Sequence, residues 1–416
     1  MAFRNPAVRF ASRESGSSAM QLQKRNKPLI GGLAVLVTTA GLLASTMQPA
    51  TADPTRPYAA TGSDTTQDVW NGLTNDFGAP ITSVASWNAF AVGDTLNYIQ
   101  TKTKGNWFER PAGSTNGVRS LSAVWDPGYA SKEWFTGSNP HIVMNHEDVD
   151  FARSSGGPSA GTGLKYVPFA RDAVTVAYNS NGTTLGSALN LTTNQLKELY
   201  TGVDDAADTV VTFSAQPATA STIVSINGQA VQPKIPQQGS GTRAFFQGAT
   251  GAAALAAYIS DPATGGLPEN SGAALPNSGD LIPFSAAQWI AQNNGKVPDT
   301  TAAGLFLASV NSSLPTSGAA PTLAPGPLFG TTNASGNYNA VPGTGVGVFN
   351  RDTYNVVPTA FIGGTGTPKQ NALVSILGSA SGVYGAGSKT VITSYGFGFL
   401  SYGTNQANWL DGIWRH

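Results

Sequence analysis

The most constraining feature of this sequence is a Gly-Ser-Gly-Thr-Arg segment at residues 239–243. Residues 231–235 before it predict a short strand, and the Ala-rich run after its glycines predicts a helix over residues 242–259. Free backbone N–H groups, two hydroxyls and the positive end of the helix dipole would then meet at one point. Arg243 adds a planar, permanently charged group suited to an oxyanion. The turn predicts an anion site, with plain helix capping as the alternative.

Two further segments repeat this pattern of small hydroxyl residues before a predicted helix. Residues 58–61 predict a strand, and a Gly-Ser-Asp-Thr-Thr turn separates them from helical spacing over residues 67–73. A Gly-Ser-Thr-Asn-Gly segment at 113–117 also leads into an apolar run. In the first of these turns Asp64 or Thr65 is a natural N-cap, which is the alternative explanation. Three such turns in one chain predict helix N-termini that converge on a dehydrated anion.

The N-terminus has the composition of a cleaved export signal. Six basic residues lead into an apolar run, and Ala-Thr-Ala at residues 50–52 predicts cleavage before Asp53. A retained membrane anchor is the alternative. Removal of residues 1–52 takes six basic residues and one acidic residue from a chain with 23 of each, which leaves a net charge of −5. A negative mature chain disfavours nucleic acid or an anionic membrane as a partner.

The remaining composition narrows the class of protein. The chain has 416 residues and no cysteine, so it has neither disulfides nor thiolate metal sites nor a lipid-modified cysteine. Only 11% of residues are charged, whereas Gly and Pro number 49 and 26. This composition indicates a secreted, loop-rich globular protein of two or three domains. No second long apolar run predicts a membrane span.

Further segments have clear secondary-structure patterns. Residues 166–179 predict a long strand, and residues 191–200 predict a helix with Thr192 and Gln195 in capping-box spacing. Residues 312–347 are rich in Pro, Gly, Ser and Thr and predict an irregular excursion. Shorter predicted strands lie at 142–144, 209–213, 223–226, 281–284 and 356–362, and shorter helices at 285–291 and 370–377.

Two kinds of catalytic or metal chemistry have weak support. His146, Glu147, Asp148 and Asp150 are acidic or imidazole groups close in sequence, but their spacing matches no established metal pattern. A Ser-His-acid triad would need His141 or His146, and no Gly-x-Ser-x-Gly segment accompanies either of them. We therefore expect neither a metal nor another cofactor, and we expect a binding protein rather than an enzyme.

Six motifs in the same order resemble the phosphate-binding proteins of ABC importers, the PstS-like family. The resemblance covers most of the chain after residue 52. It includes the turn after residue 61, the Gly-Ser-Thr-Asn-Gly-Val turn, and an Asp-Phe-Ala-Arg-Ser-Ser stretch that is similar to the family's Asp-Phe-Gly-Ala-Ser-Asp. A crossing strand and a Leu-x-x-x-Gln-Leu-x-x-x-Tyr-x-Gly-like helix follow. The last motif is the Gly-Ser-Gly-Thr turn in a variant that carries Arg.

The resemblance implies an α/β fold of the periplasmic-binding-protein type II class, with two lobes and the ligand in the cleft between them. Lobe one would comprise residues 53–167 and 350–416, and lobe two residues 168–349. It implies a secreted or periplasmic monomer that captures inorganic phosphate for an ABC permease, with no reaction. Carried over by position, the phosphate-binding candidates are Ser63, Asp64, Thr65, Ser114, Ser240, Gly241, Thr242 and Arg243, with Arg153 and Ser155 as further possibilities.

Two departures from the family pattern bear on selectivity. A carboxylate that accepts the proton of bound phosphate in some members is replaced here by Ser155, and an Arg upstream of the Gly-Ser-Gly-Thr turn is replaced by Pro236. Asp64 is then the candidate proton acceptor, and Arg243 the candidate replacement charge. Alternatives for the whole chain are a binder of another oxyanion such as sulfate, a secreted phosphatase or other hydrolase, or a surface adhesion module.

Overall fold

The computed structural model describes residues 55–90, 98–134, 142–145, 147–262, 267–339 and 342–416. The predicted export signal at residues 1–52 and its cleavage site lie outside the described residues, as do His141 and His146. In the described ranges, no helix has both the length and the apolar character that a membrane span requires.

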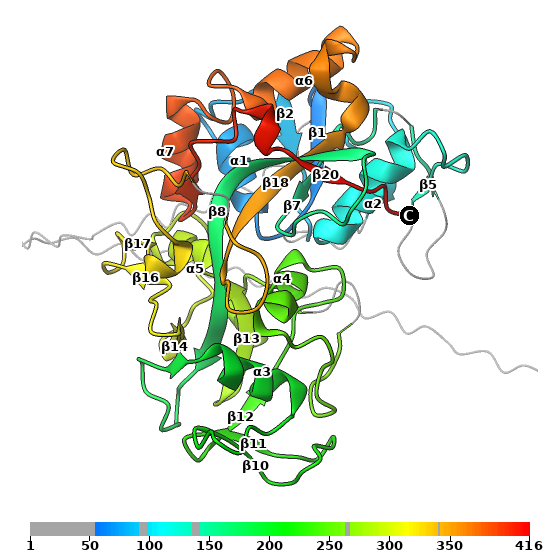
Figure 1. The fold of residues 1–416 in the computed structure, drawn as a ribbon. Coiled ribbons are helices and arrows are strands. Elements are labelled where there is room, and N and C mark those ends of the chain that lie inside the picture. Colours follow the sequence, from blue (N-terminus) through cyan, green and yellow to red (C-terminus); the bar gives the residue numbers. More distant parts are fainter. Residues whose placement is uncertain (1–54, 91–97, 135–141, 146, 263–266, 340–341) are drawn as a thin grey trace, which may run out of the picture. The chain divides into compact units, whose positions relative to one another are not determined.

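A strand of 16 residues, β8 (Leu164–Asn179), organises the largest sheet (Figure 1). Its residues are mostly apolar, aromatic or β-branched, and all except Lys165 are buried, as expected for a strand covered on both faces. Residues 164–173 pair antiparallel with β18 (Asn350–Pro358), whereas residues 174–178 pair antiparallel with β13 (Asp280–Ser285). The strand therefore serves two groups of strands.

The first strand group consists of β18, β7, β1 and β2. β18 pairs antiparallel with β7 (Phe151–Ser154), and β1 (Tyr58–Gly62) lies parallel between β7 and β2 (Val84–Ser86). Two short strands, β19 (Gly398–Phe399) and β20 (Leu410–Gly412), add to β8 beside this group. Because β1 and β7 are parallel, their carboxyl ends lie at one edge of the sheet.

The second strand group consists of β13, β12, β11 and β10. β12 (Gln229–Pro233) is parallel to β13, and the antiparallel strands β11 (Val224–Ile226) and β10 (Val211–Phe213) extend the group. The change of partner between Ala173 and Val174 separates the two groups along β8. The predicted α/β class with crossing strands is confirmed by this order, and the residue boundaries of the lobes stay predictions.

Three helices begin at the turns that the sequence marked: α1 (Gln67–Thr74), α2 (Ser114–Trp125) and α4 (Gly241–Thr250). The predicted capping box is confirmed at α3 (Thr193–Thr201), where Thr192 and Gln195 satisfy each other's backbone N–H. The other helices are α5 (Ala286–Asn293), α6 (Pro368–Gly378) and α7 (Ala386–Ser394), with 3-10 turns η1 (Gly272–Ala274), η2 (Pro327–Phe329), η3 (Thr359–Gly364) and η4 (Gln406–Asn408).

Two sequence-based boundaries are wrong. The helix predicted over residues 242–259 ends at Thr250, because Gly251 takes a left-handed conformation (φ 73°) and closes the last turn on Gln247. The Ala-rich run after it is irregular, and Ala252, Ala256 and Ile259 bury their side chains in the core. The strand predicted at 356–362 ends at Pro358, and η3 follows.

The predicted irregular excursion is confirmed over most of residues 312–347. It contains the short strands β16 (Thr316–Ser317) and β17 (Ala324–Pro325) and the turn η2. The minor strands elsewhere are β3 (Tyr98–Ile99), β4 (Phe108–Glu109), β5 (Glu133–Trp134), β6 (Ile142–Val143), β9 (Asn190–Leu191), β14 (Leu305–Leu307) and β15 (Ser309–Val310).

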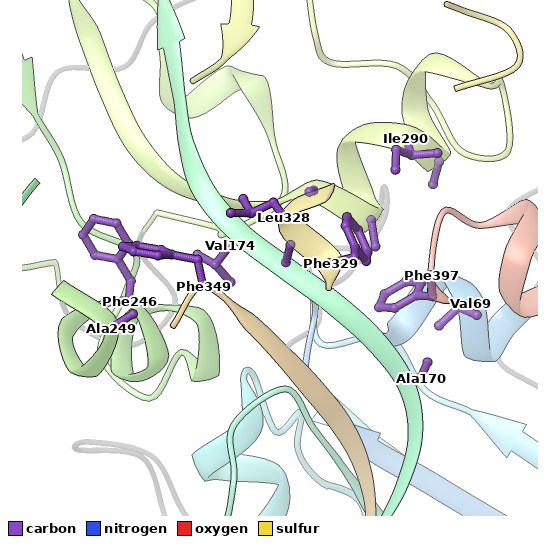
Figure 2. Packing of buried hydrophobic residues seen from close by; sticks show 14 of the residues in the cluster. Val69, Ala170, Val174, Phe246, Ala249, Ile290, Leu328, Phe329, Phe349 and Phe397 are labelled. Atoms are coloured by element: carbon purple, nitrogen blue, oxygen red, sulfur yellow. The ribbon is translucent and has the colours of Figure 1, made fainter. Parts of the chain in front are cut away.

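The main hydrophobic core draws on both strand groups (Figure 2). Figure 2 shows Phe246 of α4 with Phe349, which comes just before β18, and Val69 of α1 with Phe397 elsewhere in the same cluster. Phe246 and Phe397 are completely buried. Because one apolar cluster supports α1 and α4, the helix starts that bear the predicted anion turns rest on a common packed base.

Candidate anion site

The structure brings four segments with hydroxyl side chains together. They are the turn from β1 to α1, the start of α2, the end of β7 and the start of α4. Gly62 and Ala112 form a parallel bridge, and the Thr115 N–H donates to the Gly239 carbonyl at 3.2 Å. These backbone contacts fix the three predicted turns against one another, so they converge as the sequence predicted.

The side chains of Thr65, Ser114, Ser155, Ser240 and Thr242 form what we call the hydroxyl cluster, and all five are buried. The Thr65 hydroxyl lies 3.2 Å from the hydroxyls of both Ser155 and Thr242. The Ser155 hydroxyl lies 3.1 Å from that of Ser114, whose oxygen also accepts the Ser155 N–H at 2.9 Å. Thr65 and Ser155 follow β1 and β7 of the first group, and Ser114 follows β4 of a separate two-stranded sheet, whereas Ser240 and Thr242 follow β12 of the second group.

Gly241 allows this close approach. A Cβ atom at this position would lie 2.5 Å from the Ser155 Oγ and 2.6 Å from the Ser114 Oγ, distances that real Cβ atoms essentially never show. Gly241 is the first residue of α4, and the backbone N–H groups in this first turn have no acceptor within the helix. Glycine here lets the positive end of α4 reach hydroxyls that belong to the other strand group.

Helix capping explains part of the pattern. The Ser240 side chain accepts the Arg243 N–H at 3.0 Å and is the N-cap of α4. At α1, in contrast, the N-cap is Thr66, and its side chain makes no capping hydrogen bond. Neither Asp64 nor Thr65 is therefore the N-cap that the capping explanation predicted. α2 begins after Gly113, which is in a left-handed conformation (φ 86°) and has no side chain to cap with. The hydroxyls of Thr65 and Ser114 therefore remain available to the cluster.

Ser63 and Asp64 precede the cluster and are completely buried. Among the described residues, the Ser63 hydroxyl has no hydrogen-bond partner. The two Asp64 carboxyl oxygens have no side-chain partner either when Asp64 and its neighbour Glu269 are both ionised. The pKa of Asp64 is raised well above its usual range, mainly by burial of the carboxyl and in addition by the negative charge of Glu269. The two carboxyls can hydrogen-bond to each other only if one of them keeps its proton.

Glu269 is the site residue that sequence reasoning missed. Its side chain is completely buried, and its Oε1 accepts from Thr65 and, at 3.5 Å, from Ser155. Its Oε2 accepts from Ser240 and, at 3.4 Å, from the Thr242 N–H. The surrounding Pro-Glu-Asn sequence has no pattern that indicates a ligand, so no local signal could have found it. The hydroxyl cluster thus binds a carboxylate.

The arginine that contacts the cluster is Arg351 of β18. It donates from Nη2 to the Thr242 hydroxyl at 2.7 Å and to Asp172 at 2.8 Å. Its Nη1 is buried and has no partner among the described residues. In the antiparallel register Arg351 lies opposite Asp172, and Asp352 lies opposite Arg171, so two ion pairs cross the junction between β8 and β18.

The two arginines proposed from sequence are directed elsewhere. Arg243 forms a two-pronged ion pair with Asp261, at 2.5 and 3.1 Å, and donates to the Pro236 carbonyl at 3.2 Å. Arg153 is completely buried, and its guanidinium donates to carbonyls of Ala60 and Trp87 at 3.1 and 2.8 Å. Arg153 therefore joins the carboxyl ends of β1 and β2.

The acidic segment near residue 148 has structural contacts. Asp148 accepts the Asn145 N–H at 2.7 Å, and Asp150 accepts the Ala59 N–H at 2.8 Å and pairs with Lys102 at 2.7 Å. In the part of the chain that the structure describes, no group of His, Cys, Asp and Glu residues is arranged to hold a metal ion. The histidines weighed for a catalytic triad lie outside the described residues.

Comparison with known proteins gives structural neighbours only. No family model and no curated protein sequence matches the chain. A putative phosphate ABC transporter substrate-binding protein from Clostridium perfringens, solved with bound phosphate, is 14% identical and covers 83% of this chain and 99% of its own, with a TM-score of 0.44. An ABC-type phosphate transport receptor from Vibrio cholerae is 16% identical over 82% and 98%, with a TM-score of 0.42.

A phosphate-binding protein from Stenotrophomonas maltophilia is 14% identical over 85% of this chain and 93% of its own, with a TM-score of 0.43. The names of these three neighbours describe binding and transport, not catalysis. The similarity is to the fold, and the chemistry of this chain is argued below from its own residues.

Proposed function

We propose that this chain is a binding protein for inorganic phosphate and that the hydroxyl cluster holds the anion. One observation carries the proposal: buried hydroxyls from both strand groups and the start of α4 surround a single carboxylate. An arrangement that satisfies the oxygens of a carboxylate also suits the oxygens of a phosphate. The proposed ligands are Ser63, Asp64, Thr65, Ser114, Ser155, Ser240, Gly241 and Thr242, with the positive charge supplied by Arg351, because the sequence-based candidate Arg243 is paired with Asp261.

The Asp64 carboxyl favours binding of phosphate over binding of sulfate. Phosphate near neutral pH still carries a proton that a carboxylate can accept, whereas sulfate has none and would meet an unpaired buried charge. Asp64 is completely buried in the turn that leads to the hydroxyl cluster, and in its charged form its carboxylate can accept that proton. We expect Asp64→Asn to raise sulfate affinity and to narrow the phosphate-to-sulfate ratio about tenfold, or about 1.4 kcal/mol.

The physiological role follows from the same proposal. A binding protein with an export signal at residues 1–52 would act outside the cytoplasm, as a secreted or periplasmic monomer, and would deliver phosphate to an ABC permease. Hydroxyls on two strand groups joined by β8 and β18 would allow the groups to close over the anion by hinge motion. The fold's structural neighbours named for phosphate transport are consistent with this role.

Calorimetric titration of the chain from residue 53 with phosphate and with sulfate tests the proposal. Gly241→Ala should weaken phosphate binding at least about tenfold, because the added methyl group displaces the Ser155 and Ser114 hydroxyls. Gly248→Ala is the matched control: it lies in the same helix, and its Cβ would meet nothing within 4 Å. Equal binding by both variants, or no binding by the parent chain, would contradict the proposal. Product release from a chromogenic phosphate ester would instead support a hydrolase.

A further inference from the structure

The Glu269 carboxylate is held by the groups that would hold a ligand. Each of its oxygens has two contacts: Thr65 and Ser155 on Oε1, and Ser240 and the Thr242 N–H on Oε2. These donors come from the carboxyl ends of β1 and β7 and from the first turn of α4. A hydroxyl proton donated to Glu269 cannot be donated to another acceptor at the same time. Glu269 and a bound anion therefore compete for the same donors.

We propose that Glu269 is an internal occupant of the anion site and that a bound anion must displace its carboxylate. This inference rests on the proposed function of the hydroxyl cluster. It makes Glu269 a residue that determines affinity by opposing binding, in contrast to Thr65, Ser240 and Thr242, which support it. The apparent affinity is then the intrinsic affinity reduced by the fraction of molecules in which Glu269 has left the cluster.

The charges around Glu269 favour its displacement. Asp64 lies beside it in the turn after β1, and both carboxyls are completely buried. Arg351 of β18 reaches the cluster only through Thr242 and is already paired with Asp172 of β8. In the described part of the chain no ion pair neutralises Glu269, so withdrawal of its carboxylate relieves repulsion with Asp64 whenever both groups are ionised.

The local backbone permits a side-chain movement without loss of the segment's anchors. Asn270 donates from Nδ2 to the Asp64 carbonyl at 3.3 Å, and its own carbonyl accepts from Gln292 of α5 at 2.8 Å. Pro268 and Asn270, on either side of Glu269, are partly exposed. A rotamer change at Glu269 can therefore turn the carboxylate toward solvent while the Asn270 contacts hold the chain.

Titration of Glu269→Ala with inorganic phosphate tests the inference. Removal of the occupant should tighten binding about tenfold or more, since the cluster no longer has to be vacated first. Glu147→Ala is the control for the loss of one negative charge, because Glu147 is 71% exposed and pairs only weakly with Lys369 at 3.4 Å. Glu147→Ala should leave the affinity unchanged.

The outcomes separate this inference from the proposed function. Tighter phosphate binding by Glu269→Ala than by the parent chain supports the inference. Equal or weaker binding by Glu269→Ala, with a parent chain that binds phosphate, overturns it and leaves the proposed function in place. If neither chain binds phosphate, both fail. Should Glu269→Ala not fold, Glu269→Gln decides the sign, because the amide keeps the volume and removes the charge.

Discussion

Arg243 lies in the first turn of α4 and Arg351 contacts that turn, but the guanidinium groups of the two residues have different surroundings. Arg243 belongs to that turn, but its guanidinium pairs with Asp261, whose side chain is 46% exposed. Arg351 is 109 residues away from Thr242 in sequence, yet it donates to the Thr242 hydroxyl and pairs with a completely buried Asp172. The cation nearest to the anion turn in sequence is therefore not the cation that reaches it in space.

The two ion pairs should also differ in energy. An exposed pair gains little, because water screens the charges and both side chains lose freedom. A buried pair gains little net stability as a pair, but the loss of one partner leaves an uncompensated charge in the interior. Arg351 and Asp172 join β18 to β8 at the junction between the strand groups, whereas Arg243 and Asp261 join a helix to a loop. Four substitutions test the two arginines and the buried and exposed carboxyls near them.

The largest effect is expected from Arg351→Ala. Among the described residues it leaves the buried Asp172 with the Ser285 hydroxyl and the Ala287 N–H as donors, so the free energy of unfolding should fall by about 3–5 kcal/mol. Urea denaturation at pH 7 measures this loss. Arg351→Ala combined with Asp172→Asn should recover part of it, because the orphan charge is gone. If the free energy of unfolding of Arg351→Ala lies within about 1 kcal/mol of that of the parent chain, the two arginines do not differ in their contribution to stability.

An intermediate effect is expected from Asp64→Asn, measured as stability against pH without phosphate. The pKa of Asp64 is raised in the folded chain by burial and by Glu269, so the unfolded chain loses this proton first as pH rises. The parent chain should therefore lose stability above the ordinary aspartate range near pH 4, and the variant should not. At pH 8 the variant should be about 1–3 kcal/mol more stable, with no difference below pH 4.

Asp261→Asn is the control for this pH dependence, with the opposite sign. The hydrogen bond from Arg243 lowers the pKa of Asp261, so its contribution is present above the ordinary aspartate range and is lost as pH falls. Asp261→Asn should therefore cost a little stability near neutral pH and nothing in acid. A parallel response of the Asp64 and Asp261 variants would contradict the assignment of Asp64 as a penalised buried carboxyl.

The smallest effect is expected from Arg243→Ala. Its ion pair is partly exposed, so the free energy of unfolding should change by about 0–1 kcal/mol, and phosphate affinity by less than about threefold. The Ser240 cap still has its backbone N–H partner in this variant. A loss of about 2–5 kcal/mol in phosphate binding would show that Arg243 leaves Asp261 for the ligand, as the sequence motif suggested.

Several features of this protein were predictable because they depend on local backbone preferences. Glycines and small hydroxyl residues before apolar periodic runs marked the starts of α1, α2 and α4. The capping-box spacing marked α3, and the long apolar run marked β8. Their order along the chain also pointed to the α/β class with crossing strands. Each signal lies within a few residues, where conformational preference is decided by neighbouring side chains.

The sequence by itself thus determined which turns could present hydroxyls and N–H groups to an anion. It did not determine which charged side chains would meet them. Glu269 lies 114 residues from Ser155, and Arg351 lies 109 residues from Thr242. Such partners are set by packing, burial and competition among several carboxylates for the same arginines and hydroxyls. These preferences are differences in free energy between whole arrangements of side chains. Only the tertiary structure therefore decided that Arg243 pairs with Asp261 and that the hydroxyl cluster binds the Glu269 carboxylate.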